Sequence, residues 1–255
     1  MLKRILLLSV FLTSLYSKEN LTYGLGAGFV STPAYIGSDK QNNRILPFPY
    51  IDYKGKYFNI NRDKIYNEFY DKDKLKIEIS LRGMLPSESK GTAREGMPDL
   101  DTIVEFGPML TYNLKEENNS SLSLLLPLRV AFALGGDDFL EYQGLLSSFD
   151  LQYKNKIFND YNFIFTSGIG FNDKRINDYY YEVKSKYATS NRSVYSSSSG
   201  YSGFHTSIAL TKKDENFWYG GFIKHYYLEG STFDDASLVE TKNSLFYGFG
   251  FSYLF

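Results

Sequence analysis

The sequence predicts an all-β protein, a closed antiparallel β-barrel that spans a membrane. Three observations lead to this fold class. The last eleven residues alternate between large apolar and mostly small side chains, the first 17 residues have the composition of an export signal, and no later stretch resembles an apolar helix. The chain nevertheless contains 23 Tyr and 21 Phe, a pattern typical of membrane barrels, in which lipid-facing and interior residues alternate along each strand.

The predicted closing strand, 243–255, has one apolar face. Because successive side chains of a strand point to opposite sides, alternate residues share a face. That face carries Leu245, Tyr247, Phe249, Phe251, Tyr253 and Phe255, opposite Phe246, Gly248, Gly250, Ser252 and Leu254. In a soluble protein a second sheet would have to cover the aromatic face. We expect lipid of the outer membrane to cover it here.

The first 17 residues are predicted to be a cleaved signal peptide. Lys3 and Arg4 precede an apolar run over 5–12, and small or polar residues follow. This run is shorter than the roughly 20 residues of a membrane-spanning helix. We therefore expect export, with a mature outer-membrane barrel domain over 18–255.

Alternation of apolar and polar residues places about 12 strands along the mature chain, with ten as the fallback number because the third and fourth are short. The predicted strands are 19–30, 44–53, 56–61, 64–70, 73–82, 101–114, 120–134, 144–154, 160–171, 202–212, 216–228 and 243–255. The clearest is 120–134, whose apolar face extends over about 13 residues, whereas strands of soluble sheets average about 5 to 6. Pro127 lacks a donor, so we expect a bulge or a missing ladder bond there.

Short and long connections alternate between the predicted strands. The short ones are 54–55, 71–73, 115–119, 155–159 and 213–215, and the long ones are 31–43, 83–100, 135–144, 172–200 and 229–242. Bacterial barrels have short periplasmic turns and long extracellular loops, so this order places both termini in the periplasm. A Ser/Tyr-rich stretch, 187–203, is expected to be a mobile loop.

Several charged side chains are expected to face the interior of the barrel. They are Lys76, Glu78, Arg82, Glu105 and Arg129. Buried charges normally pair, which favours a structural network across the lumen, but the same residues could line a solute-selective constriction. Their pattern leaves both interpretations open.

His205 and Ser207 lie two residues apart on one strand and should face the same way. The pair resembles the His-x-Ser of outer-membrane phospholipases, but the Asn-Gly that follows in that family is missing, and no orienting partner can be assigned. We therefore expect two polar lumen residues and no enzymatic activity.

Composition excludes several other classes of site. The formal charge is −1, with 28 basic and 29 acidic residues, which gives no electrostatic reason to expect nucleic acid as a partner. The chain has no Cys and only two His, so neither a disulfide framework nor a thiolate or His-rich metal site is expected, and no cofactor is predicted.

Four stretches are similar to the MipA/OmpV family of outer-membrane proteins. They are GLGAGFVSTPAYIGSD, LPFPYIDYKGKYF, NDYYYEV and YYLEGSTFDDASLVE, and they are spread over nearly the whole mature chain. The resemblance implies an outer-membrane barrel and, for one branch, a scaffold that links a lytic murein transglycosylase to a murein synthase. The aromatic residues Phe249, Phe251, Tyr253 and Phe255 also resemble the terminal signal that the barrel-assembly machinery recognises.

The leading interpretation is thus a non-enzymatic scaffold that acts through its periplasmic turns. A small diffusion channel or porin for solute uptake is the alternative, and a surface adhesin that acts through the long loops is the third.

Overall fold

The computed structural model describes residues 21–54, 59–61, 64–66, 70–72, 74–135, 140–158 and 160–255. The predicted signal peptide, 1–17, lies outside the described residues. Within them, no helix is long and apolar enough to cross a membrane.

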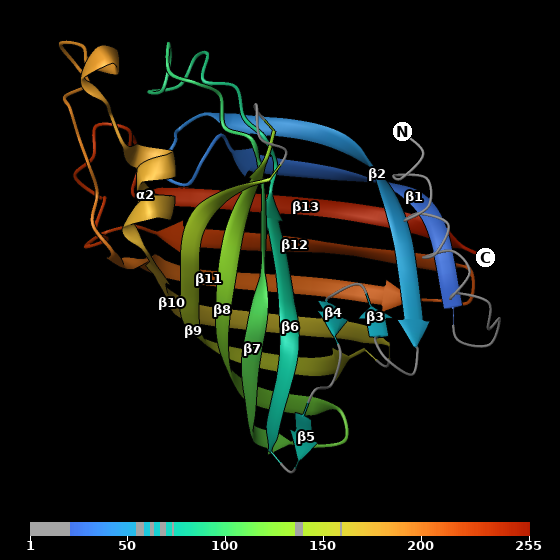
Figure 1. Cartoon of the computed structure of the whole chain (residues 1–255). Coiled ribbons are helices and arrows are strands. Elements are labelled where there is room, and N and C mark those ends of the chain that lie inside the picture. The colour runs from blue at the N-terminus through green and yellow to red at the C-terminus, as the bar shows by residue number, and fades with distance from the viewer. Residues whose placement is uncertain are drawn as a thin grey trace, which may run out of the picture.

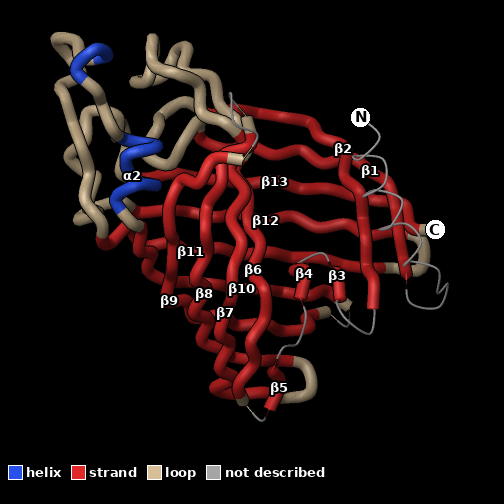
Figure 2. The backbone as a smooth tube through the Cα atoms, in the orientation of Figure 1, coloured by secondary structure: helices blue, strands red, loops and turns tan. Residues whose placement is uncertain are grey.

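The described residues form one antiparallel sheet that curls strongly (Figures 1 and 2). Its strands, in spatial order, are β4-β3-β2-β1-β13-β12-β11-β10-β9-β8-β7-β6-β5. Their bounds are β1 Leu21–Pro33, β2 Gln41–Lys54, β3 Asn59–Asn61, β4 Lys64–Tyr66, β5 Tyr70–Lys72, β6 Leu75–Met84, β7 Thr102–Glu116, β8 Ser120–Leu134, β9 Glu141–Ile157, β10 Tyr161–Asn172, β11 Gly200–Lys213, β12 Phe217–Tyr227 and β13 Asn243–Leu254.

Ten of these strands are 10 to 17 residues long, and β3, β4 and β5 have three residues each. The long strands agree with the fallback number of ten, and the count of twelve is not confirmed, because three short strands occupy the stretch where two were expected. The first and last strands of the chain, β1 and β13, pair with each other. Among the described residues no ladder joins β4 to β5 or β6, so the sheet keeps two edges and its closure stays a prediction.

The two faces of the sheet differ as the alternation predicted. Along β13, exposed and buried residues alternate from Asn243 to Leu254 without exception. Leu128, on the convex face of β8, is 51% exposed, whereas Arg129 is buried. The pairing of β8 with β9 stops after Leu125–Asp150 and resumes at Leu128–Ser147 in the same register. The predicted missing ladder pairs at Pro127 are therefore confirmed.

Short turns gather at one end of the sheet and long connections at the other. The short connections join β7 to β8 through 117–119, β9 to β10, and β11 to β12 through 214–216, and Gly24 pairs with Leu254 at this same end. The long connections 34–40, 85–101, 173–199 and 228–242 lie at the opposite end, together with helix α2, Lys174–Tyr181, and the 3-10 helix η1, Ser185–Tyr187 (Figure 1). The predicted alternation of connection lengths is confirmed for these connections, whereas the predicted connections 54–55, 71–73 and 135–144 lie partly outside the described residues.

The long connections fold onto one another and form a hydrophobic core of their own, which we call the loop cap. Its buried residues are Ala34, Tyr35, Met97, Leu100, Tyr181, Val183, Leu228, Phe233, Ala236 and Leu238. The stretch 187–203, predicted to be a mobile loop, is instead held in place: Tyr195 Oη donates to Asp235 Oδ1 at 2.9 Å, and Ser197 Oγ donates to Asp178 Oδ1 at 2.8 Å.

A second cluster fills the interior near the short turns. Trp218 packs between Phe48 and Tyr50, with ring centroids 5.4 and 6.2 Å away, and Leu254 joins them. The pairing of β1 with β13 depends on glycines of β1. A Cβ on Gly26 would lie 1.7 Å from the carbonyl oxygen of Phe251. Small residues on this face therefore allow β1 and β13 to approach closely.

Candidate functional site

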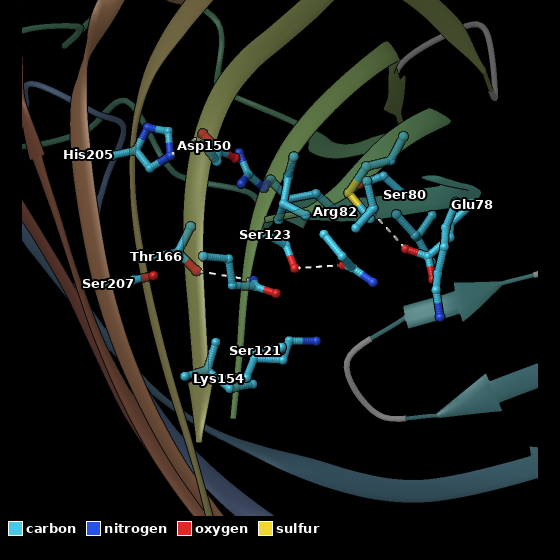
Figure 3. A pocket seen from close by; sticks show the side chains of 18 of the residues that line it. Glu78, Ser80, Arg82, Ser121, Ser123, Asp150, Lys154, Thr166, His205 and Ser207 are labelled. Carbon is cyan, nitrogen blue, oxygen red and sulfur yellow. Dashed lines mark hydrogen bonds and ion pairs between the residues drawn. The ribbon is translucent and has the colours of Figure 1, made fainter. Parts of the chain in front are cut away.

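The concave side of the sheet encloses a polar cavity of about 530 Å³ between β6 and β12, which we call the interior cavity. Figure 3 shows side chains of several strands pointing into this common space. Its charged lining residues are Lys76, Glu78, Arg82, Glu116, Arg129, Asp150, Lys154, His205 and Lys224. Its neutral polar lining residues are Ser80, Thr111, Asn113, Ser121, Ser123, Gln152, Thr166 and Ser207.

Most of the residues that the sequence predicted to face the lumen lie on the concave side of the sheet, because side chains alternate between the two faces of each strand. Lys76, Glu78 and Arg82 reach the interior cavity from β6, Arg129 from β8 and His205 from β11. Glu78 is 3% exposed and accepts a hydrogen bond from Thr111 Oγ1 at 3.1 Å.

Glu105, on β7, lies beside the interior cavity instead of in it. It borders a smaller cavity of about 80 Å³, together with Arg82 and Arg129. This smaller cavity connects the polar interior to the loop cap.

His205 has a carboxylate partner that sequence reasoning did not find. Its Nε2 lies 3.1 Å from Asp150 Oδ1, and Ser148 Oγ donates to Asp150 Oδ2 at 2.9 Å. Asp150 could have been identified, because it occupies an inward position of the predicted strand 144–154. In the part of the chain that the structure describes, no serine or threonine hydroxyl is hydrogen-bonded to the His205 ring.

Three cations of the cavity wall form no direct ion pair with a carboxylate among the described residues. Arg129 is 6% exposed, and its Nε donates to Ser80 Oγ at 2.7 Å. Lys224 Nζ lies 4.5 Å from the centre of the Tyr226 ring. Arg82 lines both cavities, and its guanidinium donates no hydrogen bond to a protein group in the described ranges. Lys224 was also missed by the sequence reasoning, although it shares the inward face of β12 with Tyr226.

The loop cap covers one end of this interior. Ile36, Tyr180, Tyr181 and Phe233 come from the long connections and line the smaller cavity above Arg82. Tyr181 stacks on Phe233 with ring centroids 4.1 Å apart, and its Oη donates to the carbonyl oxygen of Ile36 at 2.8 Å. The cap is thus packed directly against the polar interior.

Two arginines tie the connections of the cap together. Arg94 is buried and donates from Nη1 to the carbonyl oxygen of Tyr180 at 2.6 Å. Arg192 lies in the connection 173–199 and bonds back to the connection of Arg94: its Nη1 donates to the carbonyl oxygens of Ala93 and Glu95 at 2.7 and 2.9 Å. Burial lowers the pKa of Arg94 and raises that of Tyr180 well above its ordinary value.

The convex face carries aromatic side chains near both ends of the strands. At the short-turn end, Tyr23 stacks on Phe255 with centroids 5.6 Å apart, and Phe217 lies 5.3 Å from Tyr253. At the cap end, Phe132 lies 6.0 Å from Tyr142. The residues of the predicted assembly signal point outward: Phe249, Phe251, Tyr253 and Phe255 are 65%, 55%, 44% and 65% exposed.

The chain has low structural similarity to several solved outer-membrane proteins. A bacterial polysaccharide outer membrane secretin matches with a TM-score of 0.49 at 8% identity, covering 94% of this chain and 100% of that chain. The NanC porin matches with a TM-score of 0.35 at 9% identity, covering 92% and 98%. OmpT of Vibrio cholerae matches with a TM-score of 0.35 at 8% identity, covering 94% and 99%. No curated protein matches the chain by sequence.

The family comparison is more specific. Residues 25–255 match the family model of the MltA-interacting protein MipA, which confirms the resemblance found in the sequence. This match extends from β1 to the end of the chain and includes every strand of the interior cavity and every connection of the loop cap. The chain therefore belongs to the MltA-interacting protein MipA family.

Proposed function

We propose that this protein is a non-enzymatic scaffold of the outer membrane that presents its short turns to partners in the periplasm. The observation that carries the proposal is the packed loop cap, which covers the end of the interior opposite the short turns. Because the long connections are used to build this cap, the short-turn end is the surface left for protein partners.

Placement in the outer membrane is supported by the convex face of the sheet. Its large exposed side chains along the long strands are apolar. Aromatic side chains lie near both ends of these strands, as they do in membrane barrels at the two boundaries between lipid and water. The exposed aromatic residues of β13 fit recognition by the barrel-assembly machinery. On this proposal, short turns and both termini lie in the periplasm.

The proposed partner is a lytic murein transglycosylase, with a murein synthase as the second member of the complex. The family is described as MltA-interacting, and this chain belongs to it. The short turns carry exposed charges that suit a protein partner, including Glu117, which forms an ion pair with Lys115 at 2.7 Å, and Asp214, paired with Lys212 at 3.0 Å.

Binding of a purified lytic murein transglycosylase to the folded chain in detergent tests this proposal. We expect Glu117→Lys and Asp214→Lys together to weaken binding about tenfold, because rim charges steer and orient a partner. Exposed ion pairs of this kind contribute at most about 1 kcal/mol to stability, so the variant should still fold.

The matched control is Val194→Lys, which changes a 62% exposed residue of the loop cap. Binding should be unaffected by this change. Absence of binding to the unmodified chain, or equal losses in the cap and turn variants, would contradict a scaffold that acts through its short turns.

A diffusion channel is the second candidate, and the polar interior cavity is the observation that favours it. Conduction through the chain would require the loop cap to move away from the cap end. The planar-bilayer experiment described in the Discussion separates the two functions.

A further inference from the structure

We propose that the interior cavity is a binding site for a small solute that carries carboxylate or phosphate groups, and that Arg82, Arg129 and Lys224 hold the charged group. The proposal does not depend on the scaffold function, because it concerns the concave side of the sheet and not the turns. It begins with a charge imbalance: among the described residues, five cationic residues and three carboxylates line the cavity, apart from His205, and a fourth carboxylate, Glu105, lies beside it.

Neighbouring carboxylates compensate this surplus only in part, because Glu105 and Asp150 interact with Arg82 and Arg129 without forming direct ion pairs. Arg82, Arg129 and Lys224 form no ion pair with a carboxylate in the described part of the chain. The nearby Asp150 is occupied by His205 and Ser148. Removing cations from water without a direct ion pair is costly, so a bound anion would offset part of this cost.

The chemistry of these three side chains suits an oxyanion. Arg129 uses Nε for Ser80, which leaves its two terminal nitrogens for another acceptor. A guanidinium presents paired donors whose spacing matches carboxylate and phosphate oxygens, and an ammonium adds a compact positive charge. Arg82 on β6, Arg129 on β8 and Lys224 on β12 therefore line the part of the interior cavity where the negative charge of a bound carboxylate or phosphate would be neutralised.

The rest of the cavity wall suits a hydroxyl-bearing molecule. Thr111, Asn113, Gln152, Thr166 and Ser207 supply neutral donors and acceptors. The volume of about 530 Å³ lies within the range of roughly 300 to 1,000 Å³ that is usual for small-molecule sites. An acidic or phosphorylated sugar has both the charge and the hydroxyl groups that this lining would recognise.

The same structure indicates the side from which a solute enters. A hollow of about 250 Å³ beside the turn 117–119 shares Glu116, Ser121 and Lys154 with the interior cavity. At the other end, Tyr180 and Phe233 of the loop cap cover the cations. The site is therefore reached from the short-turn end.

Calorimetric titration of the full folded chain in detergent tests this inference, with glucuronate, glucose 6-phosphate and neutral glucose as probes. We expect saturable binding of at least one charged probe and none of glucose. Arg82→Gln should weaken that binding about tenfold or more, since a hydrogen bond to a charged group is worth about 1.5 kcal/mol or more and 1.4 kcal/mol is tenfold. Lys224→Gln should act in the same direction.

Arg175→Gln is the matched control, because it removes an exposed cation from the outer side of α2. It should leave binding unchanged, and a heat-modifiability gel verifies that each variant has folded. Binding of only one charged probe would support the site and identify the group it prefers. Three results would overturn the inference: no saturable binding of either charged probe, equal binding of glucose, or equal effects of Arg82→Gln and Arg175→Gln.

Discussion

Tyrosine hydroxyls of the loop cap are shielded from water by the packing of the long connections. Burial is the main cause that raises the pKa of Tyr179 to about 12, and it also raises the pKa values of Tyr180 and Tyr181. The hydroxyl of Tyr179 accepts a hydrogen bond from the backbone N–H of Asp101 at 2.8 Å. These side chains are thus part of the contacts that hold the cap together.

A pH dependence follows from these shifts. Because the pKa of Tyr179 is about 12 in the folded protein and about 10 in an unfolded chain, its burial favours the neutral form. Its contribution to stability is fully present below pH about 10 and is lost as the pH rises through about 12. We expect tyrosinate absorbance and protease cleavage of the long connections to increase together in that window. Titration of the cap tyrosines at their ordinary pKa, with the cap still resistant, would contradict this.

Single residues of the site could be predicted only in part. Glu78, Arg82 and Arg129 were found because each occupies an inward position of a strongly alternating strand. The contact between Asp150 and His205 was not found, because it joins β9 and β11 across β10, and strand pairing over that distance cannot be deduced from local alternation.

At the scale of the strand, the alternation of faces determines which surface meets lipid. β8 places Leu126, Leu128 and Val130 on the convex face and Arg129 inside. Its ladder gap at Pro127 lies where the proline lacks a donor. Faces and long strands were therefore predictable from sequence, whereas β3, β4 and β5 have three residues each, too few for a periodic pattern to define.

Leu128→Arg tests the lipid-facing assignment, because Leu128 lies in the middle of β8. A charged arginine on the lipid side costs about 2 to 4 kcal/mol near the middle of a bilayer. We expect that loss of folding free energy for the chain refolded into lipid vesicles. Ser207→Arg, which points into the interior cavity, is the matched control and should cost less. Equal costs at the two positions would show that the convex face is not in lipid.

At the scale of the whole molecule, the loop cap is the feature that sequence reasoning did not predict. Its core combines Tyr35, Leu100, Val183, Phe233 and Leu238, which come from four separate connections and follow no common period. Apolar residues in long connections can be assigned to a core only once the strands have placed those connections at one end. The cap also changes the functional conclusion, because it separates the polar interior from the cap end of the protein.

The measurement that tests the account most directly is planar-bilayer conductance of the folded chain, beside a variant in which residues 174–199 are replaced by a short Gly/Ser linker. A heat-modifiability gel verifies that both proteins have folded. We predict no discrete currents from the unmodified chain, because the cap closes the interior, and discrete currents from the variant, because α2 and its packing partners are removed. Discrete currents from the unmodified, folded chain would contradict the capped interior and favour the channel.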